Sequence, residues 1–168
     1  MLQSSDVVVL FAVAESDDEW TLRSLADRLG VKHSKIQRAL GRLAEAGLYD
    51  PARRRLIEPS VEEFLLHALR YLHPIAEGAL TRGIPTAWGA APLSDEIHSQ
   101  EPPPVWPDPR GTFRGPAIEP LDDSLPRLSK EWPEVAQLAA LADGLRIGDA
   151  RTRSAAERLL LDKLRAPA

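Results

Sequence analysis

Two short amphipathic patterns follow one another between residues 21 and 46, separated only by a Gly-Val turn. Apolar residues recur every three or four positions in both: Leu22, Leu25, Ala26 and Leu29 in the first, and Ile36, Ala39, Leu40 and Leu43 in the second. Gly30 ends the first pattern and Gly47 ends the second. The sequence therefore predicts a helix, a tight turn and a second helix, the latter over residues 32–46.

The residues on either side extend this unit. Thr21 is placed to cap the first of the two helices, with Trp20 and Leu25 as a hydrophobic staple. An earlier helix is expected from Ser5, as its N-cap, to Ala14, before the polar stretch ESDDE.

After Gly47, GLYDPARRRLIEP predicts a short hairpin. Residues 48–50 form the outgoing strand, Pro51 and Ala52 the turn, and residues 54–58 the returning strand, which Pro59 ends. Ser60 and Glu63 have the spacing of a capping box, so we expect a further helix to about His73.

The rest of the chain divides into two parts. Residues 74–93 show no sustained period, and nine of the 15 prolines lie between 102 and 133, so we expect an irregular Gly/Pro-rich segment over 74–130. Residues 131–168 predict a helical pair, which begins at Ser129 or Trp132, breaks near Asp143 and resumes after Asp149 as a cap. The fold class is thus mainly α, with residues 1–73 as the first domain.

Tryptophans occur in all of these segments, which indicates that the proline-rich chain docks on the helices. For the loop around Trp88 two interpretations remain open. Its ring packs under the N-terminal domain, or it contacts a dimer mate or another partner.

Charge is distributed unevenly. The chain has a net charge of −4 and a pI near 5.6, which argues against a protein that coats nucleic acid indiscriminately. Residues 21–57, however, hold nine lysines and arginines against three acidic residues. A local basic surface is therefore predicted within an acidic protein.

The stretch TLRSLADRLGVKHSKIQRALGRLAEAGLYDPARRR resembles the winged helix-turn-helix of bacterial transcriptional regulators of the MarR and related groups. The shared features are the Leu-Ala pair of the first of its helices, the Gly-Val turn, the Arg-Ala-Leu and Leu-x-x-x-Gly-Leu of the next, and the hairpin. The resemblance covers about residues 5–73. It implies three helices, a hairpin wing and a fourth helix that together bind double-stranded DNA.

The helix over residues 32–46 would enter the major groove. With about 100 degrees per residue and Ile36 at the centre of the buried side, the opposite arc carries Ser34, Lys35, Arg38 and Arg42, with Gln37 at its edge. The resemblance assigns bases to Ser34, Lys35 and Gln37, a guanine edge or a phosphate to Arg38, and the backbone to Arg42. It places Arg53, Arg54 and Arg55 of the wing at phosphates or the minor groove.

One position departs from the family pattern. Many relatives have Ser or Thr as the N-cap after the Gly-Val turn, whereas this chain has Lys32, which cannot accept the free N–H groups. His33 or Ser34 is the alternative cap, and it would shift the start of the helix.

The expected function is a sequence-specific transcriptional regulator, a repressor of its own or a neighbouring operon, that acts as a cytoplasmic homodimer without a cofactor. Two alternatives remain. The basic helix face is merely solvated, or the protein is an antitoxin or regulatory subunit whose residues 74–168 wrap a partner protein.

Other classes of function lack a supporting pattern. Glu63, His67 and His73 do not make up a four-ligand metal site, and the chain has no cysteine. No nucleophile elbow or phosphate-binding glycine loop supports an enzyme. The apolar run VVVLFAVA is too short for a membrane span and follows no basic segment.

Overall fold

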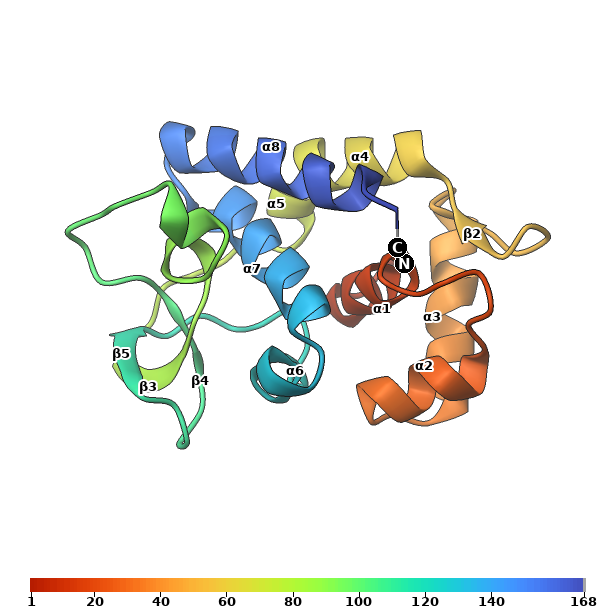
Figure 1. Ribbon diagram of the computed structural model, residues 1–168, viewed down its shortest axis with the longest axis horizontal. Coiled ribbons are helices and arrows are strands. Elements are labelled where there is room, and N and C mark those ends of the chain that lie inside the picture. Colours follow the sequence, from red (N-terminus) through yellow and green to blue (C-terminus); the bar gives the residue numbers. More distant parts are fainter. Residues whose placement is uncertain (168) are drawn as a thin grey trace.

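The computed structural model describes residues 1–167 and is mainly helical, as the sequence predicts (Figure 1). The helices are α1 (Ser4–Ala14), α2 (Leu22–Leu29), α3 (His33–Glu45), α4 (Glu58–His67), α5 (Leu69–Leu72), α6 (Leu125–Glu131), α7 (Pro133–Ile147) and α8 (Ala150–Arg165). The strands are β1 (Tyr49–Asp50), β2 (Arg55–Leu56), β3 (Leu80–Pro85), β4 (Val105–Pro107) and β5 (Phe113–Pro116).

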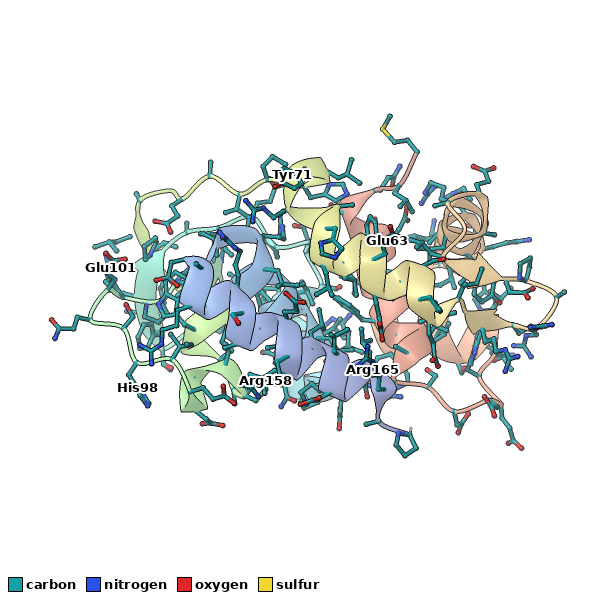
Figure 2. All side chains as sticks on the ribbon, turned by 90° about the horizontal axis from the view of Figure 1, so that it is seen from above. Glu63, Tyr71, His98, Glu101, Arg158 and Arg165 are labelled. Carbon is teal, nitrogen blue, oxygen red and sulfur yellow. The ribbon has the colours of Figure 1, made fainter. Side chains whose placement is uncertain are left out.

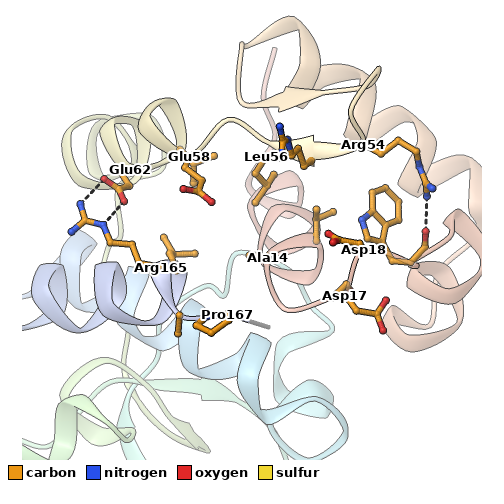
Figure 3. A pocket seen from close by; sticks show the side chains of 16 residues that line it. Ala14, Asp17, Asp18, Arg54, Leu56, Glu58, Glu62, Arg165 and Pro167 are labelled. Carbon is orange, nitrogen blue, oxygen red and sulfur yellow. Dashed lines mark hydrogen bonds and ion pairs between the residues drawn. The ribbon is translucent and has the colours of Figure 1, made fainter.

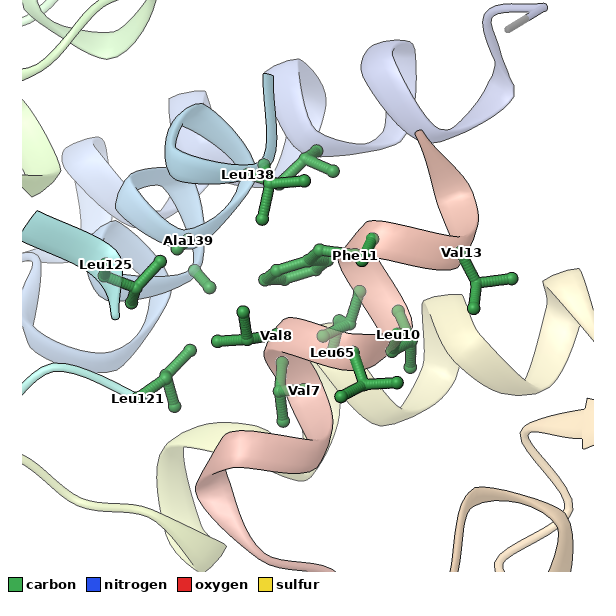
Figure 4. Close-up of a cluster of buried hydrophobic side chains, with 14 of the residues drawn as sticks. Val7, Val8, Leu10, Phe11, Val13, Leu65, Leu121, Leu125, Leu138 and Ala139 are labelled. Carbon is green, nitrogen blue, oxygen red and sulfur yellow. The ribbon is translucent and has the colours of Figure 1, made fainter. Parts of the chain in front are cut away.

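Helix α1 lies in the centre of the molecule. Because residues 7–14 contain no polar side chain, the helix can be buried on all sides, and Val7 to Val13 are at most 6% exposed. Phe11 and Val8 point toward α6 and α7, where Leu125, Leu138 and Ala139 meet them (Figure 4). The C-terminal helices and the first helix therefore share one hydrophobic core.

The start of α1 differs from the expected cap at Ser5. Gln3 is the N-cap, and its backbone N–H donates to Asp6 Oδ2 at 2.8 Å. The helix begins earlier because Asp6 accepts from the residue three positions before it, which closes a capping box around Gln3.

Helices α2 and α3 form as predicted. Ser24 N–H donates to Thr21 Oγ1 at 3.0 Å, so Thr21 is the N-cap of α2. Gly30 then adopts a left-handed conformation with φ of 68°, which a side chain would strain. The α3 N-cap is Lys32, without a side-chain hydrogen bond.

The hairpin pairs Tyr49 with Leu56 and Asp50 with Arg55, within the predicted strands. The next helix, however, does not use Ser60 and Glu63 as a capping box. It begins at Glu58, with Pro59 in its first turn, where the missing N–H of proline costs nothing. It then breaks at Ala68 into α4 and α5 instead of running unbroken to His73.

The segment 74–130 contains a three-stranded antiparallel sheet in the order β4-β3-β5, contrary to the irregular chain that its composition predicts. The prolines are compatible with the hydrogen bonds between the strands because they lie on edge strands or at the end of a strand. Pro107 and Pro116 lie on the two edge strands, and Pro85 is the last residue of the central one.

The sheet is joined to α7 by a buried polar network. Asp143 is fully buried and accepts hydrogen bonds from Trp106 Nε1 at 2.8 Å, Thr86 Oγ1 at 2.7 Å and Arg146 Nη1 at 2.9 Å. Burial raises the pKa of the Asp143 carboxyl, and the Arg146 guanidinium and the two hydrogen bonds oppose that rise.

The predicted break near Asp143 does not occur, and α7 continues to Ile147. Asp143 lies inside this helix, where it accepts the hydrogen bonds that join α7 to the sheet. The adjacent Gly144 serves close packing, since a Cβ there would lie 2.9 Å from Leu93 Cδ2. Asp149 caps α8 as predicted, accepting from Thr152 N–H at 2.8 Å. Helices α8 and α4 lie on the same face of the molecule (Figure 2), and Arg165 of α8 donates two hydrogen bonds to Glu62 of α4.

Candidate nucleic-acid interface

Helix α3 has one buried side and one free side. Ile36 and Leu43 are at most 1% exposed and pack in the core that α3 shares with α1. In Figure 1 the opposite side of α3, together with the β1–β2 hairpin, forms one end of the molecule. This end carries most of the residues that the sequence selects for DNA contact.

The free side, which we call the outer flank, consists of Ser34, Gln37, Arg38 and Gly41. All four are exposed, and their spacing of three and four residues places them in one stripe. Within residues 1–167, the side chains of Ser34, Gln37 and Arg38 form no hydrogen bond or ion pair. Gly41 has no atom within 4 Å of the position that a Cβ would take. The outer flank is therefore open to a large partner.

Arg42 is not on this flank, contrary to its predicted contact with the DNA backbone. Its Nε and Nη2 each donate to the carboxylate of Asp6 at 2.8 Å, and Asp6 is fully buried. This bidentate bond raises the pKa of Arg42. Arg42 lies about 120 degrees from Ile36 around the helix, at the boundary that α1 covers, so it joins two helices.

Lys35 lies seven residues, or about two helical turns, before Arg42, and these two residues form what we call the inner flank. Its Nζ is 3.5 Å from Asp122, and its side chain remains 41% exposed. Nearby, Arg127 Nη2 donates to the carbonyl oxygen of Leu29, at the end of α2, at 2.6 Å. The segment before and within α6 thus holds the turn between α2 and α3 in place.

The three hairpin arginines differ from one another. Arg54 has a φ of 55°, its guanidinium lies 4.7 Å from the centre of the Trp20 ring, and it donates to the Trp20 carbonyl. Arg53 lies 3.7 Å from Asp50 and is 70% exposed. Arg55 is exposed and has no ion partner among residues 1–167. Arg54 therefore anchors the hairpin, and Arg53 and Arg55 are its accessible cations.

Two further cations lie at this end of the molecule but are absent from the residues predicted as DNA contacts. Arg23, in the first turn of α2, and Lys32, before α3, are exposed and unpaired among the described residues. The excess of basic residues over positions 21–57 includes both, so charge alone could have selected them. Arg28 is different, because its guanidinium stacks 3.5 Å above the Trp132 ring.

A pocket of about 380 Å³ opens behind the hairpin, between α1, α4 and the end of α8 (Figure 3). Two of its cations are already bound, Arg54 to Trp20 and Arg165 to Glu62 at 2.7 Å. Glu58 and Asp18 also line it. The first bond connects the hairpin to the segment before α2, and the second connects α8 to α4.

Residues 1–167 contain no group of His, Cys, Asp or Glu side chains arranged to hold a metal ion. Within the same residues, no helix has the length and apolar character that a membrane crossing needs. Comparisons of the chain with protein-family models, with curated proteins and with solved structures found no match.

Proposed function

We propose that this protein is a sequence-specific DNA-binding regulator of transcription that uses a winged helix-turn-helix of the MarR-related kind. The observation that carries the proposal is the outer flank of α3, where Ser34, Gln37 and Arg38 are exposed and unpaired beside the cations of the hairpin. The order of α1, α2, α3, hairpin and α4 supports it as well.

In this proposal α3 lies in the major groove. Arg38 donates two hydrogen bonds to O6 and N7 of a guanine, and Gln37 pairs with N6 and N7 of an adenine. Ser34, near the beginning of the helix, donates or accepts at a neighbouring base edge. Gly41 leaves the flank without a side chain one turn further on, where the groove wall can approach the helix.

The hairpin supplies contacts that position the protein on the DNA without reading the base sequence. Arg53 and Arg55 bind phosphates or enter the adjacent minor groove, and Arg54 holds the hairpin on Trp20. Arg42 and Lys35 hold α3 in its orientation from the inner flank. Little conformational entropy is therefore lost when DNA binds. A homodimer would place two such helices about 34 Å apart on a two-fold symmetric operator, and repression follows when that operator overlaps a promoter.

The test is a binding titration with the DNA upstream of the protein's own gene and with random duplex, at two salt concentrations. We expect a specific complex that weakens steeply with salt, because bound arginines release counterions from phosphates. Arg38→Ala is expected to cost about 1–3 kcal/mol on the specific duplex and little on random duplex. Arg151→Ala, an exposed arginine in the first turn of α8, is the matched control. Equal affinity of the wild type for both duplexes would refute the proposal.

A further inference from the structure

At the end of the molecule opposite α3, two arginines lie side by side on adjacent strands of the β-sheet. Arg82 of β3 and Arg114 of β5 are directly paired in the antiparallel register, and both are exposed. Side chains in such a pair have Cβ atoms about 5 Å apart, and like charges there destabilise the sheet. Because side chains alternate along a strand, Leu80 lies on the same side of the sheet, two residues before Arg82.

No carboxylate of the described chain forms an ion pair with either arginine. Strands β3, β4 and β5 contain no acidic residue, and neither guanidinium takes part in a hydrogen bond or ion pair within residues 1–167. Asp108, just after β4, lies beside Arg82, since its backbone N–H donates to the Arg82 carbonyl at 3.1 Å, and its carboxylate accepts from the backbone N–H of Arg110 at 2.9 Å. The two guanidinium groups are therefore side by side and available to a partner.

An exposed apolar side chain adjoins the two arginines. Leu80 is 59% exposed, which is unusual among the large hydrophobic residues of this protein. Phe113, next to Arg114 on β5, is 40% exposed but lies on the other face of the sheet. Arginine is enriched in protein–protein interfaces and among the residues that contribute most of the binding energy. Figure 1 shows this sheet at the far end of the long axis from α3 and the hairpin, so occupation of one end leaves the other free.

We infer that Leu80, Arg82 and Arg114, on one face of the sheet, form a docking surface for an acidic segment of a partner protein. Each guanidinium can bind one carboxylate through two parallel hydrogen bonds, so a segment with two acidic residues close to each other fits the pair. An apolar side chain of the same segment covers Leu80. Phosphates would also match the charges, but a nucleic acid gains little from the exposed leucine. This surface is separate from the proposed DNA interface and adds a second binding function.

The experiment measures fluorescence anisotropy of a labelled dodecapeptide that alternates glutamate and leucine, titrated with the full-length protein. A peptide that alternates glutamate and serine carries the same charge without the apolar side chains, and we expect it to bind about tenfold more weakly. A single-stranded DNA of the same length is the third probe. Tighter binding of this DNA than of the glutamate–leucine peptide, provided that the Arg82→Glu change weakens it, would overturn the inference, and so would no peptide binding by the wild type.

Arg82→Glu is the most informative variant, since it places a carboxylate opposite Arg114. The new pair with Arg114 is favourable and offsets the repulsion from the neighbouring Asp108, so the variant is expected to fold with a nearly unchanged melting temperature while peptide affinity falls about tenfold or more. Arg151→Glu makes the same charge change on α8 and is expected to bind as the wild type does. Equal losses in both variants would mean that net charge alone attracts the peptide.

Two further measurements separate this surface from other interpretations. Sedimentation velocity of wild type and Arg82→Glu tests for self-association, and a dimer that only the variant loses would identify a second copy as the occupant and overturn the inference. The Arg82→Glu variant is also titrated with the upstream duplex. An unchanged DNA affinity is expected, because the sheet is remote from α3, so the two proposals can fail independently.

Discussion

The two flanks of α3 carry the same kinds of residue and use them differently. Arg38 and Arg42 are one helical turn apart, yet Arg38 is exposed and unpaired on the outer flank while Arg42 is bound to the buried Asp6. Lys35, on the inner flank, is paired with Asp122. The difference depends on what covers each flank, α1 and the chain before α6 on one side and solvent on the other. Charge on a helix is therefore evidence of a binding face only where no acid lies across from it.

The largest effect is expected for Arg42→Ala. Removal of the guanidinium leaves the carboxylate of Asp6 buried without its cation, so unfolding free energy is expected to fall by about 3 kcal/mol. Arg38→Ala, on the outer flank, is expected to change stability by less than about 0.5 kcal/mol. Urea denaturation of both variants measures the contrast, and similar small losses in the two would show that the flanks do not differ.

A second contrast exists within the hairpin, between neighbouring arginines. Arg54→Ala loses the contact with the Trp20 ring and the hydrogen bond to its carbonyl, so a stability loss of about 1–2 kcal/mol is expected. Arg55→Ala is expected to leave stability nearly unchanged and to reduce the salt dependence of DNA binding by one phosphate contact. Thermal melts and salt titrations of the pair check this, and a melting temperature unaffected by Arg54→Ala would contradict the anchoring role.

These contrasts also explain what could be predicted from the sequence. Helices α2 and α3 follow from spacing, the Thr21 cap and Gly30, all of which act over a few residues. The burial of Arg42 could not be predicted in the same way, because its partner Asp6 is 36 positions away and only tertiary packing brings them together. The flank of Lys35 is likewise determined by Asp122, in a segment that composition describes as irregular.

The sheet over residues 80–116 was missed for a related reason. Its strands are three to six residues long and pair β3 with both β4 and β5, so no strand carries a sustained alternation. Prolines suppress the expectation of strands, although edge positions tolerate them. In the sequence, Asp143 and Gly144 resemble a helix-breaking Asp-Gly pair. Only the hydrogen bonds that Asp143 accepts across the fold, from Thr86 and Trp106, explain its place inside α7.

A substitution at Gly41 tests whether this part of the outer flank contacts DNA. A glycine inside an exposed helix costs about 1 kcal/mol relative to alanine, and nothing lies within 4 Å of the added Cβ. Gly41→Ala is therefore expected to raise stability by about 0.5–1 kcal/mol and to weaken specific DNA binding, because the methyl group enters the proposed contact. Chemical denaturation and duplex titration measure both effects. A stabilised variant with full DNA affinity would place the DNA away from this part of the flank.

The smallest expected effect concerns the exposed ion pair of the inner flank. Lys35 and Asp122 are 3.5 Å apart and partly solvated, so Asp122→Asn is expected to change stability by less than about 1 kcal/mol. The same change frees Lys35, which lies beside the outer flank, and removes a carboxylate that repels phosphate. DNA affinity is therefore expected to rise modestly, with a steeper salt dependence. Asp123→Asn, which removes a neighbouring exposed charge but leaves the pair intact, is the control. If both variants raise DNA affinity equally, the effect comes from the change in net charge, and the ion pair does not restrain Lys35.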